Sequence, residues 1–557
     1  MDRKLCSVFP VDDRSALNPT QRSRHLAEME SEGVDVVVVG GGVTGAGAAL
    51  DAVTRGLRVA LVEQRDYASG TSSRSSKMFH GGLRYLEHFE FGLVREALRE
   101  RNLMMNDLCP HLVRPASFVY PLKHRFWERI YVGAGVLLYE ILARMADNPL
   151  PWHSHLGRDG IKDLAPAISA LGGIRYWDSI VDDARHTLIV ARTAAAHGAL
   201  LASSTRLTKV TQENGRIQNV AVVDLETGRE VIIATRSVIN ATGVWTDDVE
   251  GLAGDPGRDV QASKGIHLLI PRDRIASETG LLLRTEISVL FVIPWDQHWI
   301  VGTTDTPWTL GRAHPAASQT DIEYLLRWVN TVLRKPLVAE DIVGVYAGLR
   351  PLLKGESDET SKLSREHAVV DRGNGLVSVA GGKYTTYRVM AADAVDAIAP
   401  YLDTDLRSST TERIPLVGAA PPLDERIHSR YGALKTEIGE SVAVNPHYGM
   451  PVVADSPYLI AEVAYAVTHE GALHLDDVLT RRTRLSIETR HRGVAAAPAV
   501  AAVMGEILGW DRETIYREIG HYEARVRAEL DSQKQPDDRT ADAARMGAPD
   551  VRTGVSD

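Results

Sequence analysis

The chain has 557 residues, and its 73 acidic residues outnumber its 63 lysines and arginines, which gives a formal net charge of -10. This acidic balance argues against a nucleic-acid-binding protein, and the length predicts two or three domains. Only two cysteines occur, Cys6 and Cys109, too few for a disulfide framework or a cysteine-rich metal site. We therefore expect a globular protein of the reducing cytoplasm, with no metal and no nucleic-acid partner.

The first 33 residues are rich in charge and contain no apolar segment of the kind that a signal peptide needs. We expect residues 1–33 to form an N-terminal extension and regular structure to begin at Val34.

Residues 34–63 predict a β-α-β unit. The apolar, β-branched run 34–39 and the run 58–62 are typical of strands buried on both faces of a parallel sheet. A helical pattern lies between them and begins in a glycine-rich turn. This order predicts a Rossmann-like nucleotide-binding domain.

The turn holds Gly40, Gly42 and Gly45 in the spacing G-x-G-x-x-G. The first glycine of this motif permits a tight turn, the second lets the backbone approach a pyrophosphate, and the third lets helix and strand pack closely. Glu63 ends the second strand and can accept hydrogen bonds from ribose hydroxyls, which disfavours a cofactor with a 2′-phosphate. The motif predicts a dinucleotide and leaves NAD and FAD open.

The central part of the chain predicts antiparallel strands. The runs 217–222 and 231–234 flank one turn, and the runs 289–295 and 299–303 flank another. Each pair predicts a β-hairpin.

A second glycine motif, Asn240-Ala241-Thr242-Gly243, follows the strand-like run 237–239. It stands where a later stretch of chain would return to the same cofactor, with Gly243 at the contact. A single nicotinamide-binding unit needs no such return, so the motif favours FAD. Helical patterns dominate after about residue 400, and the polar composition of 531–557 predicts a disordered tail.

The run 131–143 is strongly apolar and follows Lys123, Arg125 and Arg129. It is shorter than the roughly 20 residues that a membrane-spanning helix needs, and it contains Glu140. Two interpretations stay open: a buried helix, or a helix with basic flanks that lies on a membrane surface.

Several long stretches resemble one known family, the FAD-dependent glycerol-3-phosphate dehydrogenases of aerobic respiration. The resemblance runs in order from about residue 34 to 530 and so covers nearly the whole chain. The similar stretches are GTSSRSSKMFHGGLRYLEHFEFGLVREAL (70–98), IVDDARH (180–186), NATGVW (240–245), SKGIHLLIP (263–271), VIPWDQHWIVGTTDT (292–306), GLRPLL (348–353), GGKYTTYR (381–388) and DDVLTRRTRL (476–485).

The resemblance implies a mixed α/β fold. A discontinuous FAD-binding Rossmann-like domain would span residues 34–399, with an antiparallel, β-rich substrate domain inserted at about 116–180 and 261–345. A helical cap domain would follow at 400–530.

The resemblance also implies a reaction. The family oxidises sn-glycerol 3-phosphate to dihydroxyacetone phosphate, with hydride passing from C2 to flavin N5 and electrons passing on to a membrane quinone. Members of this kind sit on the cytoplasmic face of the plasma membrane as peripheral proteins. The expected assembly is a homodimer.

A phosphorylated substrate needs fixed cationic donors, for which Arg offers a fork and Lys a point charge. The resemblance places candidates for substrate contact in glycine-flanked or neighbouring motif positions. They are Arg84, Tyr85, Arg350 and Lys383, with His80, Lys264 and Thr304 as further members.

Loss of a hydride from C2 requires removal of the C2 hydroxyl proton, and histidine is the usual base. His80 and His267 lie in the family motifs. We favour His267, on a predicted strand of the substrate domain, and keep His80 as the alternative. Arg350 can stabilise the developing alkoxide.

The resemblance also implies flavin contacts beyond the glycine turn. A cation near flavin N1 would stabilise the reduced cofactor. The implied residues are Ser72, Ser73, Ser76, Gly382 and Lys383.

Three other functions stay open on the sequence. The same scaffold serves oxidases that pass electrons to oxygen, and these share the motifs. An FAD-dependent amine oxidase of the wider fold group would need an Arg for a carboxylate rather than several cations. A flavoprotein without catalysis would bind FAD but would not be reduced by glycerol 3-phosphate.

Overall fold

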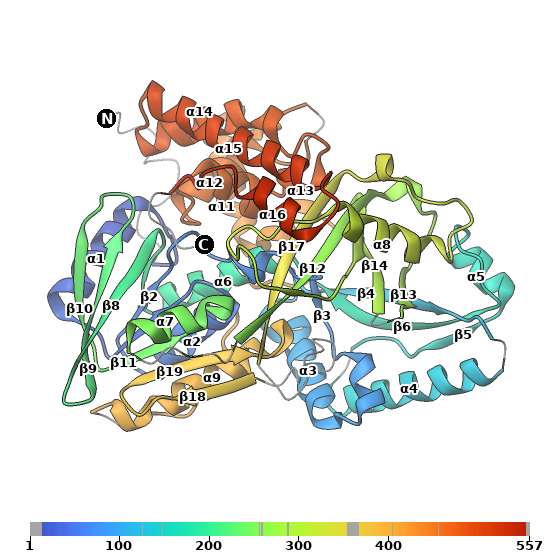
Figure 1. Ribbon diagram of the computed structural model, residues 1–557, viewed down its shortest axis with the longest axis horizontal. Helices are drawn as coiled ribbons and strands as arrows, with labels where there is room; N and C mark the ends of the chain where they lie inside the picture. Colours follow the sequence, from blue (N-terminus) through green and yellow to red (C-terminus); the bar gives the residue numbers. More distant parts are fainter. Residues whose placement is uncertain are drawn as a thin grey trace.

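The computed structural model describes residues 14–552 apart from 125, 148, 255–256, 258–259, 287–288, 354–366, 404 and 455. Cys6 and Arg125 therefore lie outside the described residues. Figure 1 shows two groups of strands side by side, with a group of helices above them.

Within the described chain, six strands form the nucleotide-binding sheet, in the order β18-β19-β11-β1-β2-β7. The parallel strands are β1 (Val36–Val39), β2 (Val59–Val62), β7 (Leu200–Ala202), β11 (Ser237–Asn240) and β19 (Leu376–Gly381). The edge strand β18 (His367–Asp371) is antiparallel. Every residue of β1 and β2 is buried, which explains their continuous apolar sequence. The predicted β-α-β unit is confirmed.

Helices from distant parts of the chain cover this sheet. Helix α2 (Val43–Thr54) packs against α6 (Asp183–Ala196) and α9 (Tyr387–Ala397), and all three contribute to one apolar core. Helix α7 (Thr246–Leu252) lies beside β19.

A small antiparallel sheet lies beside the first. Its strands are β8 (Thr205–Glu213), β9 (Arg216–Asp224) and β10 (Glu230–Ala234). The hairpin predicted at 217–234 is confirmed by the β9–β10 pairing.

The prediction that regular structure begins at Val34 is wrong. Helix α1 (Pro19–Glu32) precedes it, with Asn18 as its N-cap, and packs on β7 and β10. The Arg22 guanidinium is buried, donates to the Ser203 carbonyl at 2.7 Å and pairs with Asp224 at 2.5 Å. These contacts bury charged residues of α1 inside the protein, which the charge-rich sequence did not suggest.

A larger mixed sheet forms the second half of the molecule. Its strand order is β16-β12-β15-β14-β13-β4-β6-β3, with β17 paired to β12 and β5 paired to β6. Its strands come mainly from two stretches of the chain, which meet where β4 pairs with β13, and β3 is added at the edge beside β6. They are β3 (Met78–Phe79), β4 (Arg114–Pro121), β5 (Ser154–Leu156), β6 (Gly173–Ile180), β12 (Val260–Pro271), β13 (Gly280–Arg284), β14 (Val289–Trp295), β15 (His298–Gly302), β16 (Thr306–Trp308) and β17 (Gly344–Leu353). The predicted β14–β15 hairpin is confirmed.

Helices surround this sheet. Helix α8 (Gln319–Asn330) packs on one face through an apolar core that includes Ile322 and Leu325. Helices α3 (Phe91–Leu103) and α4 (Trp127–Arg144) contact each other at the lower edge in Figure 1, and α5 (Arg158–Leu164) lies near β5.

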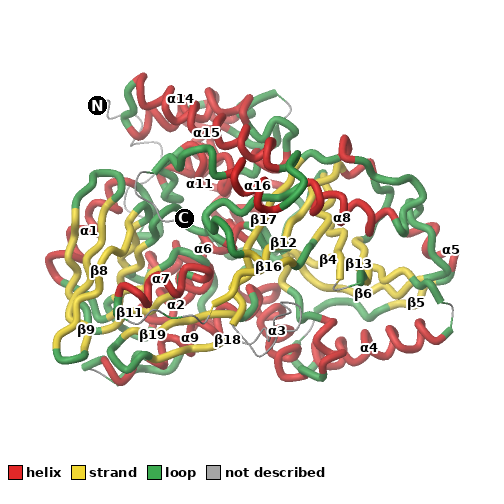
Figure 2. Tube along the Cα trace, viewed as in Figure 1, coloured by secondary structure: helices red, strands yellow, loops and turns green. Residues whose placement is uncertain are grey.

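The C-terminal part is helical, as Figure 2 shows by its red segments above the sheets. Its helices are α10 (Arg426–Tyr431), α11 (Lys435–Val444), α12 (Ile460–Thr468), α13 (Leu485–Glu488), α14 (Ala497–Leu508), α15 (Arg512–Ser532) and α16 (Asp538–Arg545). The predicted mixed α/β fold with helical C-terminal part is confirmed.

The prediction of disorder from residue 531 onward is wrong for the part that the structure describes, up to residue 552. Helix α16 packs through Ala541, which is fully buried beside Trp308. The Arg552 guanidinium is also buried and pairs with Asp477 at 2.9 Å. The polar composition of this segment is explained by buried ion pairs rather than by contact with solvent.

Candidate active site

A cavity of about 1990 Å³ lies between the two large sheets. It is lined by the carboxyl ends of β1, β2 and β11, by the turn after β19, and by residues of β12, β14 and β17 in the larger sheet. Ligands of open α/β sheets bind at this edge of the parallel strands. The volume exceeds that of a pocket for one small molecule and fits a dinucleotide together with a substrate.

The glycine turn forms the cavity wall at the start of α2. Gly40 adopts φ 109, and a Cβ on Gly45 would lie 1.9 Å from the Gly40 carbonyl oxygen. Gly45 is thus required for close packing and does not itself line the cavity. Gly42 lines it, and the Val43 N–H beside it donates to the Ser72 hydroxyl at 2.9 Å.

Glu63 lines the same end of the cavity. Its carboxylate accepts from the Gly41 N–H at 2.6 Å and from the Arg65 N–H at 2.8 Å. Burial raises the pKa of this carboxyl, and the two hydrogen bonds counter the effect. The acid sits where the motif predicts an acceptor for ribose hydroxyls.

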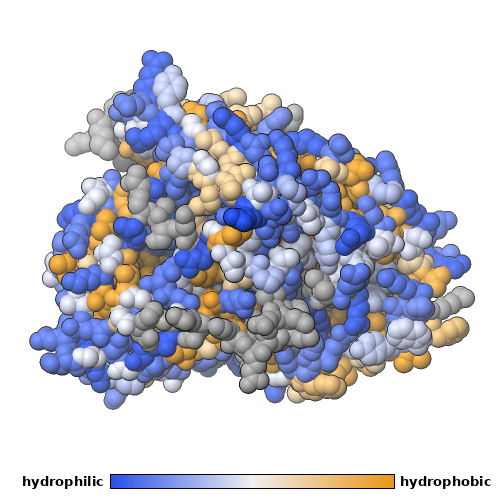
Figure 3. All heavy atoms as spheres, viewed as in Figure 1, coloured by the Kyte–Doolittle hydropathy of each residue, from blue (hydrophilic) through white to orange (hydrophobic). Residues whose placement is uncertain are grey.

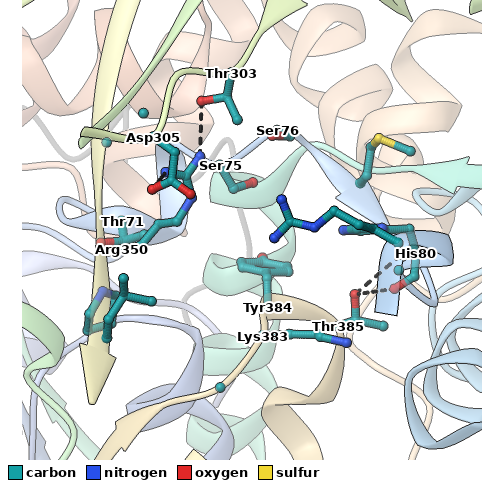
Figure 4. A pocket seen from close by; sticks show the side chains of 18 of the residues that line it. Thr71, Ser75, Ser76, His80, Thr303, Asp305, Arg350, Lys383, Tyr384 and Thr385 are labelled. Carbon is teal, nitrogen blue, oxygen red and sulfur yellow. Dashed lines mark hydrogen bonds and ion pairs between the residues drawn. The ribbon is translucent and has the colours of Figure 1, made fainter. Parts of the chain in front are cut away.

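One wall of the cavity carries Arg84, Tyr85 and Lys383. The Lys383 ammonium lies 3.7 Å from the centre of the Tyr85 ring, and the Arg84 guanidinium lies 5.9 Å from the same ring. His80 is next to them, and its backbone N–H donates to the Thr385 hydroxyl at 3.2 Å. Figure 4 shows His80 and Thr385 joined by hydrogen bonds, with Lys383 nearby.

Arg350 of β17 stands on the other side of the cavity in Figure 4. Its guanidinium donates to the Thr303 hydroxyl at 3.0 Å and to the Thr304 carbonyl at 3.1 Å. Asp305 lies 3.5 Å away as an ion-pair partner. A Cβ on Gly265 would come within 2.5 Å of this guanidinium, so the glycine makes room for it.

His267 of β12 also borders the cavity. Its Nε2 lies 2.9 Å from the Ser76 hydroxyl, and its ring stacks on Tyr346. The pKa of His267 is well below the ordinary histidine value because the ring is buried away from water and because Arg350 and Lys77 lie nearby. The ring is therefore neutral near neutral pH.

Besides Gly45, three residues expected at the site lie outside the described lining of the cavity. Lys264 is fully buried and forms ion pairs with Asp321, at 2.5 Å, and with Asp538. The Thr304 hydroxyl accepts from the Ile266 N–H at 3.1 Å, and the Ser73 carbonyl accepts from Lys77 at 3.0 Å. The assignment of Lys264 to substrate is wrong for this structure, because two carboxylates neutralise it away from the cavity. The assignments of Thr304 to substrate and of Ser73 to flavin stay predictions.

The other expected residues line the cavity together: Gly40, Gly42, Glu63, Ser72, Ser76, His80, Arg84, Tyr85, Gly243, His267, Arg350, Gly382 and Lys383. Sequence reasoning missed Thr303 and Asp305, which line the cavity beside Arg350. Both belong to the GTTDT run, in which strand alternation would have separated Thr303 from Thr304.

The fold and the cavity define a dinucleotide-dependent oxidoreductase whose substrate is anionic. Residues 35–388 match the family described as FAD dependent oxidoreductase, and residues 395–515 match the C-terminal domain of alpha-glycerophosphate oxidase. The cofactor is FAD, and the glycine turn, Glu63 and the cavity fit it.

Three similar proteins identify the family within this class of FAD-dependent enzymes. The glycerol-3-phosphate dehydrogenase of Mycobacterium leprae is 53% identical over 97% of this chain and 96% of its own. The human mitochondrial glycerol-3-phosphate dehydrogenase is 33% identical over 90% of this chain and 76% of its own. A solved glycerol-3-phosphate dehydrogenase from Bacillus halodurans, complexed with FAD, is 26% identical, covers 92% of this chain and 98% of its own, and superposes with a TM-score of 0.72. The chain belongs to the glycerol-3-phosphate dehydrogenase family of FAD-dependent oxidoreductases.

Proposed function

We propose that this protein oxidises sn-glycerol 3-phosphate to dihydroxyacetone phosphate and passes the electrons through FAD to a membrane quinone. The observation that carries the proposal is that Arg84, Arg350 and Lys383 line the same cavity as the glycine turn. A phosphate ester carries about two negative charges, and charge-assisted hydrogen bonds to such cations are the strong ones. In a chain with a net charge of -10, this local cluster provides the attraction.

Each polar residue of the cavity has a role in this proposal. Arg84, Tyr85 and Lys383 hold the phosphate, with His80 beside them, and Lys383 also approaches the flavin with Gly382. Bound FAD supplies the hydride acceptor. His267 takes the hydroxyl proton, and Arg350 stabilises the developing alkoxide. His80 remains the alternative base.

The test is an anaerobic titration. The purified protein should carry FAD, and glycerol 3-phosphate added without air should bleach the flavin absorbance. Glycine or sarcosine should leave it unchanged, because an amine oxidase needs no phosphate-binding cluster. A flavin that stays oxidised with glycerol 3-phosphate would contradict the proposal.

The proposal also specifies the electron acceptor, a membrane quinone. A second candidate is oxygen, favoured by the match of residues 395–515 to a glycerophosphate oxidase domain. Reoxidation of the reduced protein should be much faster with a soluble quinone than with air-saturated buffer. Stoichiometric peroxide with slow quinone reduction would assign the protein as an oxidase.

Helix α4 supports the choice of a membrane quinone. Within the described residues, no helix has both the length and the apolar character to cross a membrane. Yet α4 and the segments near it expose many large apolar side chains. They are Phe89, Phe91, Phe126, Trp127, Ile130, Tyr131, Leu137, Leu138, Ile141, Met145 and Trp152.

Helix α4 packs on the core through Val136, Tyr139 and Ala143, and its exposed side also carries large apolar residues. Its buried side includes Glu128, which accepts from the Lys123 and His124 N–H groups, and Glu140, which pairs with His153 at 2.7 Å. An exposed apolar face of this kind marks an interaction surface, and a helix with basic neighbours suits a lipid surface. Orange side chains lie along the lower right edge of Figure 3, where α4 runs in Figure 1.

The cavity and this apolar surface are continuous. Phe89, Trp127, Ile130, Tyr131 and Leu138 are exposed and also line the cavity. A quinone dissolved in a bilayer could therefore reach the cavity at α4 without leaving an apolar environment. This surface supports our proposal that the protein is peripheral at the cytoplasmic face of the plasma membrane. The homodimer stays a prediction.

A further inference from the structure

The His267 ring lies between neighbours on β15 and β17, the two strands that pair with β12 at this position. Tyr346 of β17 and Gly302 of β15 are its cross-strand partners. The Tyr346 ring stacks on the imidazole with centroids 4.7 Å apart and planes 12 degrees apart. On the other side, a Cβ on Gly302 would lie 2.3 Å from the imidazole Cδ2. The ring is thus held in one orientation between these neighbours.

The imidazole borders the cavity but exposes little of its surface there. His267 is only 2% exposed. Its Nδ1 is buried and has no hydrogen-bond partner among the described residues. Its Nε2 lies 2.9 Å from Ser76 Oγ. The Ser76 hydroxyl, which also lines the cavity, can therefore exchange a proton with Nε2.

Ser76 lines the cavity, and Figure 4 shows it with Ser75 between Arg350 and His80. Its backbone is held from behind through Ser75. The Tyr346 hydroxyl donates to the Ser75 carbonyl at 2.9 Å. The Ser75 N–H and hydroxyl donate to Asp183, at 3.0 and 2.8 Å. The residue that stacks on the base thus also fixes the segment that carries the hydroxyl.

We propose that Ser76 is a catalytic residue that relays the proton from the C2 hydroxyl of the substrate to His267, an inference that rests on the proposed function. As the C2 hydrogen leaves with its electron pair to bound FAD, the C2 hydroxyl proton passes to Ser76 Oγ. The proton of Ser76 passes at the same time to His267 Nε2. The products are the ketone, reduced FAD and a protonated imidazole, so protons and electrons balance. Ser76 then contacts substrate rather than cofactor.

The charges around His267 agree with this role. Arg350 and Lys77 face the ring, and Asp183 and Arg484 lie behind Lys77 in a buried ion-pair cluster. Burial lowers the pKa of His267, and the two cations facing it disfavour a positive charge on the imidazole. The ring is therefore neutral before the substrate binds. The negative charge that develops on the C2 oxygen beside Arg350 offsets one of these charges. The imidazole becomes a better proton acceptor when the substrate is present.

The test uses the full chain loaded with FAD, reduced anaerobically by glycerol 3-phosphate in a stopped-flow instrument. Ser76→Ala should lower the limiting rate of flavin reduction by roughly 10- to 100-fold, part of what general base catalysis supplies. Ser76→Thr should recover most of the rate because it keeps the hydroxyl. The FAD content and the substrate concentration at half-maximal rate should stay near wild type. Ser117→Ala, which removes a buried hydroxyl outside the cavity lining, serves as the matched control.

A solvent isotope effect adds a readout that a structural role would not move. Deuterium oxide should slow the wild type more than Ser76→Ala, because two protons move in the relay. Wild-type rates in Ser76→Ala together with a slow His267→Asn would overturn the relay and keep His267 as a direct base. Wild-type rates in His267→Asn as well would instead reject the base in the proposed function. Loss of FAD from Ser76→Ala would return Ser76 to the cofactor and overturn the inference.

Discussion

Strand β12 has two faces with opposite chemistry. Ile266 and Leu268 pack against α8, and Lys264 on the same face pairs with Asp321 of that helix at 2.5 Å. Gly265 and His267, on the other face, border the cavity. Side chains along a strand alternate between faces, so Lys264 and His267, three positions apart, cannot serve one site from the same surface.

The comparison shows what separates a structural cation from a functional one. Lys264 lies against two carboxylates, Asp321 and Asp538, which neutralise it inside the protein. Arg350 borders the cavity, with the Asp305 carboxylate 3.5 Å from its guanidinium. A buried cation with two such partners stabilises the fold, whereas one at a cavity wall can still bind an anion.

The strongest test of this difference is Arg350→Ala. Loss of one preorganised donor to a developing oxyanion should lower kcat by roughly 10²- to 10³-fold. Steady-state assays with a soluble quinone would measure this, with FAD absorbance as the check on folding. A variant that loses only substrate affinity and keeps kcat would move Arg350 from the alkoxide to the phosphate.

Gly265→Ala tests the same face without removing a charge. The new methyl group would come within 2.5 Å of both the Arg350 guanidinium and the Thr303 hydroxyl, so these side chains must shift. We expect kcat/KM to fall by about tenfold, as a displaced charged hydrogen bond costs about 1.5 kcal/mol or more. Gly439→Ala, where the methyl group meets open space, is the matched control. Equal activity in both variants would show that Arg350 tolerates displacement.

Lys264→Met should give the opposite result on the opposite face. Breaking a buried pair leaves Asp321 without its cation, which costs about 3 kcal/mol of unfolding free energy. The KM for glycerol 3-phosphate should not change. Thermal denaturation and steady-state kinetics would measure both, and adding Asp321→Asn should restore part of the lost stability. A raised KM with unchanged stability would put Lys264 back at the substrate.

The two faces of β12 also show which features of the site could be predicted from the sequence. The glycine turn with Glu63 was predictable because its signal is local, within one β-α-β unit. The placement of Lys264 was not, because Asp538, which neutralises it, lies far along the chain in a segment expected to be disordered. Helix α16 has a polar sequence, and its order depends on tertiary ion pairs that no local pattern encodes.

Helix α4 extends the comparison of faces to the surface. Its buried side carries Glu140, and its exposed side carries Leu137, which is 42% exposed. The apolar run alone could not decide between a core helix and a membrane-surface helix, because both need the same composition. The structure shows apolar residues on both sides of α4, with Val136 and Tyr139 in the core and Leu137 and Ile141 exposed.

Leu137→Glu is the smallest of the expected effects and tests the membrane contact alone. A charge on the apolar face should shift the protein from the membrane to the soluble fraction and leave flavin reduction by glycerol 3-phosphate at the wild-type rate. Ile232→Glu, at an exposed apolar residue of β10 with 55% exposure, is the matched control and should fractionate as wild type. Fractionation at low and high salt separates the apolar contribution from the basic one, since salt weakens only the latter. If Leu137→Glu stays with the membrane at both salt concentrations, α4 does not contact lipid, and the exposed series must serve another partner.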